Sequence, residues 1–177
     1  MNETLPRVDP GSVVHVAVRR RVLSLGLLGV GVLASGCGDP RLGFAGTWKG
    51  PMKTTVRFSD GSSSTYPKGE VTVVISAPER SNSIVFNGQC GMTATPNDDR
   101  AFTISKKACP GQRITFADSA GTGMISCDLV ETVGGGSGTR ATGSLTVSYF
   151  GDSQISRCTN GGSALATYTT ELTLTEQ

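Results

Sequence analysis

The chain has 177 residues, which is enough for one domain of ordinary size. Hydrophobic residues make up 37% and charged residues 17% of it, both below the average of globular proteins, while glycine occurs 24 times. The formal net charge is +2, but from residue 37 onward 12 Lys and Arg balance 12 Asp and Glu. This neutral portion offers no basic face for phosphates, so nucleic acid is excluded as an expected partner.

The first 36 residues have the layout of a secretory signal peptide. Arg19, Arg20 and Arg21 precede an apolar stretch over residues 22–33, and small residues follow that stretch. A stretch of 12 residues is too short for a helix that crosses about 30 Å of hydrocarbon, because such a helix takes about 20 residues. We therefore expect residues 1–36 to direct export and then to be removed.

The sequence LASGC over residues 33–37 puts small side chains directly before a cysteine. It resembles the lipobox of bacterial lipoproteins. The resemblance implies cleavage between Gly36 and Cys37, a diacylglycerol thioether on Cys37 and acylation of the new amine, so that Cys37 becomes the lipid attachment site. Acyl chains anchor a protein by inserting into the membrane. Each buried CH₂ group contributes about 0.8 kcal/mol to membrane binding, and two or more chains hold a protein there stably. In such proteins Gly38, rather than Asp, after the cysteine implies the outer membrane, with the domain facing the periplasm or the cell surface.

Residues 37–43 are expected to be a short tether, and residues 44–177 a single all-β domain. The tether reaches at most roughly 20 Å at about 3.3–3.6 Å per residue, which would keep the domain near its membrane.

The domain opens with a Gly-x-Trp motif at Gly46 and Trp48. The motif resembles the one that begins the first strand of lipocalin-like barrels. That resemblance implies an antiparallel up-and-down barrel of about eight strands, whose bottom Trp48 closes. An immunoglobulin-like β-sandwich is the alternative, in which a tryptophan is expected between the two bridging cysteines. Trp48 precedes every cysteine of the domain, which favours the barrel.

Short stretches of alternating apolar and polar residues follow Trp48, as is typical of strands with one buried face. Val71, Val73 and Ile75, for example, share one face of such a stretch. Turns rich in Gly, Asn and Asp separate the stretches, and the glycine-rich residues 134–138 are interpreted as one of these turns. The predicted strands are residues 45–58, 69–77, 83–88, 90–95, 100–106, 112–117, 123–133 and 139–150, with 163–175 as an optional ninth.

Four cysteines lie in the domain, and export to an oxidising compartment predicts that they form two disulfides. Of the three connectivities, the one that joins Cys90 to Cys109 and Cys127 to Cys158 keeps the loops shortest, and we favour it. No two of the four have the close spacing typical of structural zinc sites, and the one histidine, His15, lies in the expected signal peptide. No metal or other cofactor is expected.

Catalysis is not expected either. Without a histidine after export, Ser–His–Asp and Cys–His arrangements are excluded. Asp98 and Asp99 stand side by side in the turn sequence TPNDDR, which predicts a solvated turn rather than a pair of catalytic carboxylates.

Two functions remain open for a lipid-anchored envelope domain. The first is a structural or protein-interaction module whose partner is another envelope protein. The second is a lipocalin-like binder of a small apolar ligand, because an eight-stranded barrel is just wide enough either to be filled by side chains or to hold one small ligand. The residues that would line such a ligand, or form a closed core instead, are Trp48, Phe86, Phe102, Ile104, Phe116, Leu145, Val147, Tyr149 and Tyr168.

Overall fold

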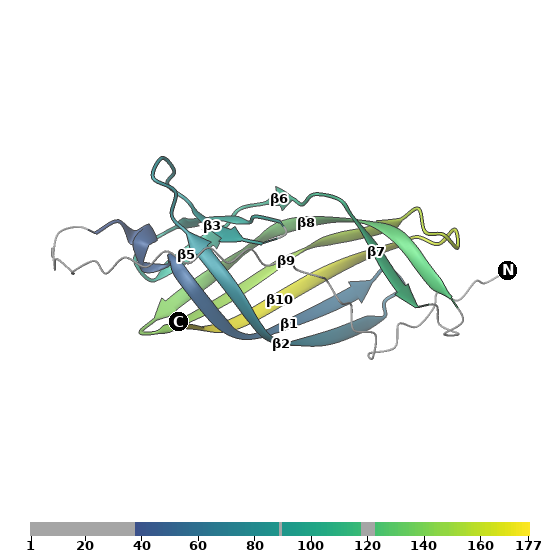
Figure 1. Ribbon diagram of the computed structural model, residues 1–177, viewed down its shortest axis with the longest axis horizontal. Coiled ribbons are helices and arrows are strands. Elements are labelled where there is room, and N and C mark those ends of the chain that lie inside the picture. The colour runs from purple at the N-terminus through teal and green to yellow at the C-terminus, as the bar shows by residue number, and fades with distance from the viewer. Residues whose placement is uncertain (1–37, 89, 118–122) are drawn as a thin grey trace, which may run out of the picture.

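A computed structural model describes residues 38–88, 90–117 and 123–177 of the chain (Figure 1). The expected signal peptide over residues 1–36 and the expected acylation of Cys37 lie outside the described residues. The described part consists of a short 3₁₀ helix and ten strands that join in one antiparallel sheet. No helix in this part is both long and apolar enough to cross a membrane.

The 3₁₀ helix η1 (Pro40–Gly43) precedes all of the strands. The strands, in chain order, are β1 (Gly46–Phe58), β2 (Ser63–Ser76), β3 (Ile84–Asn87), β4 (Thr93–Pro96), β5 (Ala101–Ile104), β6 (Lys107–Ala108), β7 (Gln112–Ala117), β8 (Met124–Ala141), β9 (Ser144–Ser156) and β10 (Ala164–Glu176).

Eight of these strands form a closed ring. Neighbours pair in the order β5-β4-β3-β2-β1-β10-β9-β8, and β5 pairs back with β8 through residues 101–104 and 136–139. Every pairing in the ring is antiparallel, and most of them join strands that follow each other along the chain. The predicted up-and-down barrel is thereby confirmed. The immunoglobulin-like alternative is wrong, because a sandwich consists of two separate sheets.

The ring is complete at only one end of the molecule. One edge of the long strand β8 pairs in turn with β7 at residues 124–129, with β6 at residues 132–133 and with β5 at residues 136–139. Strand β3, in turn, pairs with β2 only at residues 74–76 of β2. Within the described residues, the first part of β2 and the free edge of β7 therefore have no further strand partner.

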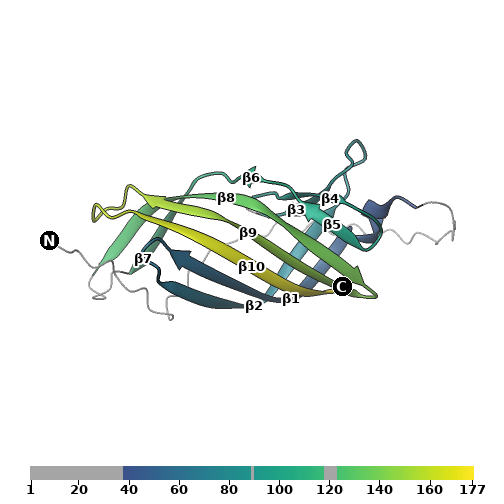
Figure 2. The same ribbon diagram turned by 180° about the vertical axis from the view of Figure 1, so that it is seen from behind.

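We call the end with the complete ring the closed half, which holds Trp48, Ile75, Phe102, Leu145 and Leu174. The other end is the open half, which holds Phe58, Phe116, Glu131, Ser153 and Ala166. Figures 1 and 2 show the two halves from opposite sides, with β3, β4, β5 and the C-terminus at the closed half and β7 at the open half.

A packed apolar core fills the closed half. Phe44, directly after η1, is fully buried, and its carbonyl oxygen accepts a hydrogen bond of 2.9 Å from the indole N–H of Trp48. The Phe44 ring meets the Phe102 ring edge to face, with 5.2 Å between centroids. Each buried side chain of this size contributes about 1.5–3 kcal/mol, so this end of the barrel carries most of the hydrophobic stabilisation.

The residues just before the barrel are fixed against its closed end. The Asp39 side chain accepts a hydrogen bond of 3.0 Å from the backbone N–H of Arg41. The Arg41 guanidinium in turn donates to the Asp39 carboxylate, to the carbonyl of Pro78 at 2.7 Å and to the carbonyl of Ser81. Residues 39–43, which the sequence analysis assigned to a tether, thus lie on the loop between β2 and β3.

The glycine-rich residues 134–138 are not a turn, contrary to the prediction. Strand β8 continues through them, and the turn to β9 comes at residues 142–143. The physical reason is packing, because a Cβ atom on Gly138 would lie only 2.1 Å from the tip of the Phe102 ring. Glycine here makes room for an aromatic ring from β5 rather than providing a flexible connection.

The bounds of several predicted strands shift as a consequence. The predicted strands 123–133 and 139–150 correspond to β8 and β9, which are both longer, and the optional strand 163–175 is β10. Strand β2 begins before the predicted residue 69, and the short strand β6 was not predicted. These differences leave the predicted order of strands intact.

Two disulfides link Cys90 to Cys109 and Cys127 to Cys158. This is the connectivity with the shortest loops, as predicted. The bridged residues are 19 and 31 positions apart, and closing loops of this size removes enough chain entropy to stabilise the fold by about 3 kcal/mol each.

Candidate functional site

The inner face of the barrel changes in burial from the closed half to the open half. Trp48, Phe102 and Leu145 are 0% exposed in the closed half. Inward-facing residues of the open half, such as Phe58 and Ile155, are only half-buried. Solvent therefore reaches the inner face in the open half, and any ligand inside the barrel must enter from that end.

Most residues predicted to line a ligand or a core belong to the core. Six of the nine contact one another and are buried in the closed half: Trp48, Phe86, Phe102, Ile104, Leu145 and Val147. Tyr149 and Tyr168 lie further along β9 and β10, between the two halves. Phe116 is half-buried on β7, opposite Ile125 of β8.

Polar side chains gather on the inner face where the two halves meet. Glu131 of β8 is paired with Ser153 of β9, whose hydroxyl donates to the Glu131 carboxylate at 3.4 Å. The rings of Tyr149 and Tyr168 stand nearly perpendicular, at 85°, with 6.2 Å between centroids. Thr170 of β10 is the register partner of Tyr149 and is buried. We call Glu131, Tyr149, Ser153, Tyr168 and Thr170 the inner polar cluster.

Glycine at position 151 brings the Tyr168 ring toward Glu131. Gly151 pairs with Tyr168 across β9 and β10, and a Cβ atom on it would lie 2.6 Å from the Tyr168 hydroxyl oxygen. The phenol thus lies over β9 in the space that a side chain would occupy. Its hydroxyl group consequently points from β10 toward β8, the strand that carries Glu131.

Burial governs the ionisation of the cluster. Loss of hydration raises the pKa of the Glu131 carboxyl group, and the hydrogen bond from Ser153 opposes this effect more weakly. Burial also raises the pKa of the Tyr168 hydroxyl, and the negative charge of Glu131 raises it further. For Tyr149, burial again raises the pKa, while the nearby Thr170 hydroxyl lowers it. The cluster is therefore a site of partly desolvated negative charge.

Among the cations whose side chains the structure describes, none forms an ion pair with Glu131. Within the same part, no residue forms a hydrogen bond with the Tyr168 hydroxyl, whose oxygen is not among the buried atoms that lack a partner and is therefore within reach of solvent. Both groups can thus accept a partner from outside the chain.

A second feature lies on the outer face of the open half. A shallow depression of about 490 Å³ crosses β1, β10, β9 and β8, with Arg57 and Asp152 beside the exposed apolar side chains of Val130 and Leu165. It mixes charges of both signs with a small apolar floor. None of the residues predicted as site residues from the sequence lines this depression.

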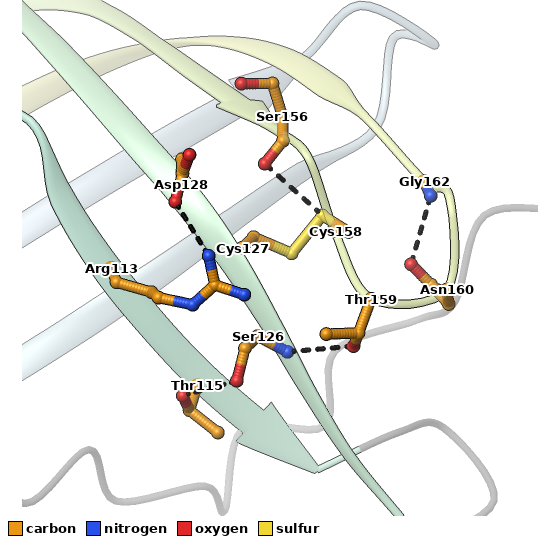
Figure 3. Close-up of a disulfide and its surroundings, with 10 residues drawn as sticks. All are labelled: Arg113, Thr115, Ser126, Cys127, Asp128, Ser156, Cys158, Thr159, Asn160 and Gly162. Carbon is orange, nitrogen blue, oxygen red and sulfur yellow. Dashed lines mark hydrogen bonds and ion pairs between the residues drawn. A yellow bond between two sulfur atoms is a disulfide. The ribbon is translucent and has the colours of Figure 1, made fainter.

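The rim of the open half is held by covalent and ionic links, as Figure 3 shows. The Cys127–Cys158 disulfide ties β8 to the loop between β9 and β10. Next to it, the Asp128 carboxylate pairs with Arg113 of β7 at 3.1 Å and with Arg157 of the same loop at 2.6 Å. These links fix the two flanking segments to β8 where little apolar packing is available.

The described residues contain no group of three His, Cys, Asp or Glu side chains that could hold a metal ion. Comparison with known proteins gives no further guide, because no family model, curated protein or solved structure matches the chain.

The sequence reasoning missed Glu131, Ser153 and Thr170 as site residues, and it missed Phe44 as the cap of the core. A signal for Glu131 is present in hindsight, since it stands at the alternate position between Leu129 and Val133 in LVETV. Its inward direction depends on the register with β9, which the sequence does not reveal.

Proposed function

We propose that the chain is an exported envelope lipoprotein, anchored through Cys37, that displays the barrel as a structural or protein-interaction module. The two disulfides support the first part, because such bonds persist outside the reducing cytoplasm. The lipobox-like residues 33–37 support the anchor.

The observation that carries the proposal is the position of η1. The Arg41 contacts fix residues 39–43 to the closed end of the barrel, only a few residues after Cys37. An acylated Cys37 would then hold the closed half next to the membrane. The open half, with its rim, its inner polar cluster and its outer depression, would face away from the lipid toward partners.

The anchor is tested by labelling cells with radioactive palmitate. We expect label and membrane association in the wild-type chain, and loss of both in Cys37→Ser. Ser35→Ala, which keeps a small side chain before the cysteine, is the matched control and should be labelled like the wild type. Equal labelling of wild type and Cys37→Ser would contradict the anchor.

The orientation is tested with two exposed leucines at opposite ends. Leu42 in η1 is 64% exposed, and Leu165 in β10 is 58% exposed. A fluorescent amino acid at position 42 should be quenched by brominated lipid in vesicles that carry the acylated protein, whereas the same label at position 165 should not. Stronger quenching at position 165 would mean that the open half faces the lipid.

Binding of a small ligand inside the barrel is the second candidate function, and one observation favours it. The inner face is accessible in the open half and ends on a polar cluster rather than on the apolar core. A ligand there would contact a carboxylate and two phenol groups. The cluster therefore favours a ligand that carries a polar group over the purely apolar ligand expected from the sequence.

A further inference from the structure

We propose that the inner polar cluster binds a small organic ammonium cation, with the Glu131 carboxylate as counter-ion and the Tyr149 and Tyr168 rings as its aromatic wall. The proposal rests on the second candidate function, ligand binding within the barrel, and is independent of the lipid anchor.

The charge of Glu131 is the first argument. A half-buried carboxylate loses part of its hydration, and this cost is recovered only when a cation or good hydrogen-bond donors replace the water. Among the side chains that the structure describes, the one donor to Glu131 is the Ser153 hydroxyl, at a long 3.4 Å, and no Lys or Arg forms an ion pair with it. A ligand with a positive charge would recover the lost free energy, whereas an anion would be repelled.

The two tyrosine rings are the second argument, because they select the kind of cation. An aromatic ring is negative on its faces and positive at its edge, and it attracts an ammonium group that lies over the face. The rings meet edge to face at 85° with 6.2 Å between centroids, so their planes form two perpendicular walls, and the edge of one ring covers part of the face of the other. Proteins recognise alkylated ammonium groups with aromatic rings of this kind, and a carboxylate beside the rings supplies the counter-charge.

The unpaired Tyr168 hydroxyl is the third argument. Its oxygen is not one of the buried side-chain atoms that lack a partner among the described residues, so it lies within reach of solvent at the inner face and of a ligand there. Tyr168 is 91% buried and reaches across Gly151 toward β8, without a hydrogen-bond partner among the described residues. A polar group on the ligand, or a water molecule that the ligand orders, would satisfy it.

The surroundings limit the size and shape of the ligand. Toward the closed half, Val147 and Leu172 belong to the buried core and block deeper entry. Toward the open half, Phe58 and Ile155 give the inner face an apolar, half-buried lining. The arrangement therefore fits a compact ammonium head at the cluster, with any short apolar tail directed outward to the open end.

The test compares choline with 3,3-dimethylbutan-1-ol, which has the same shape without the charge. Each compound is titrated into the full chain, held in a non-ionic detergent, while NMR follows the ring signals of Tyr149 and Tyr168. We expect choline to shift both rings saturably, with a dissociation constant on the order of 1 mM, and the alcohol to bind at least about tenfold more weakly. Equal affinities, or no saturable shift with choline, would overturn the proposal.

Variants assign the binding to the cluster. Glu131→Gln removes the charge and keeps the shape, so we expect choline affinity to fall at least about tenfold. Glu171→Gln is the matched control, because it removes a carboxylate from an exposed position of β10 and should bind choline like the wild type. Unchanged affinity in Glu131→Gln would overturn the proposal. A thermal melt shows whether this variant is folded, and if it is not, the comparison of choline with the alcohol in the wild type decides alone.

Two further experiments distinguish the cation site from the lipid anchor and identify the source of the cation. Cys37→Ser should bind choline as the wild type does, so a failure of the anchor and a failure of the cation site are distinguishable. Vesicles of phosphatidylethanolamine reveal the source of the cation. Displacement of choline by the vesicles would assign the site to a lipid headgroup, and retention of choline would assign it to a soluble amine. Both results uphold the site.

Discussion

Strands β9 and β10 run through both halves of the barrel, so one pair of strands can be compared at its two ends. In the closed half the inward pairs are Leu145 with Leu174 and Val147 with Leu172, and all four residues are buried. At the junction the inward pair is Gly151 with Tyr168, and in the open half it is Ser153 with Ala166, beside Glu131 of β8.

One continuous hydrogen-bonded ladder thus carries two kinds of stabilisation. The closed half is held by apolar packing, and the polar groups on its inner face are few. The open half has far fewer buried apolar side chains, which lie outside the main core, and it is also held by the Cys127–Cys158 disulfide and by the ion pairs of Asp128. This division leaves the inner face of the open half free to carry polar side chains, at which a ligand can be recognised.

The largest expected effect comes from truncating a matched pair of phenylalanines, one in each half. Phe102→Ala removes a fully buried ring of the closed half, and we expect it to lower the free energy of unfolding by about 3–5 kcal/mol. Phe116→Ala removes a half-buried ring of the open half and should cost about 1 kcal/mol. Urea denaturation of both variants measures the difference, and equal losses would contradict the division into two halves.

The second prediction removes the disulfide of the open half. Replacing both Cys127 and Cys158 with serine should lower the free energy of unfolding by about 3 kcal/mol, because the unfolded chain regains the entropy of the closed loop. Thermal and urea unfolding under non-reducing conditions measure the loss. If the double variant unfolds at the wild-type midpoint, the disulfide does not hold the rim and the account of the open half is wrong.

The third prediction concerns the junction between the halves. A methyl group at position 151 would overlap the Tyr168 hydroxyl and the Thr132 carbonyl, so Gly151→Ala should cost about 1–3 kcal/mol and displace the Tyr168 ring. Gly111→Ala is the control, since its Cβ would have no neighbour nearer than 3.9 Å. NMR shifts of the Tyr168 ring and urea midpoints report the two effects. Equal urea midpoints for the two variants would show that the Tyr168 ring does not need glycine at position 151.

The smallest expected effect is a pH dependence of stability that Glu131 causes. Burial raises the pKa of this carboxyl group in the folded state above its ordinary value of 4.5, so the folded protein binds this proton more tightly than the unfolded chain does. The free energy of unfolding should therefore fall as the pH rises from about 4.5 through the folded-state pKa.

Glu131→Gln should lack this fall. The measurement is the difference in urea midpoint between variant and wild type, followed from pH 4 to pH 7 in steps of about half a unit. This difference separates the contribution of Glu131 from that of the other carboxyl groups. A constant difference across that range would contradict the raised pKa.

Much of the fold was predictable from local pattern, since alternation placed Val71, Val73 and Ile75 on one face and Gly-x-Trp marked the first strand of the ring. The glycine-rich residues 134–138 were misread because the ring that needs their space, Phe102, lies on a strand more than 30 residues earlier. Composition cannot distinguish a glycine of a turn from a glycine under an aromatic ring.

The candidate site was less predictable than the fold. Alternation identifies Tyr149 and Tyr168 as inward-facing, but it does not tell the packed end of a barrel from the accessible end. That distinction arises because β3, β4 and β5 are short and cover β2 and β8 only near the closed half. Glu131 became recognisable only once the register of β8 with β9 placed it beside Ser153.

Amide hydrogen exchange along β9 and β10 compares the stability of the two halves within one molecule, because the same two strands serve as both sample and reference. The account predicts slow exchange, close to that of global unfolding, for residues 145–148 and 171–174, and markedly faster exchange through local opening for residues 152–156 and 164–167. Uniform protection along both strands would contradict it, since the barrel would then be one packed unit from end to end.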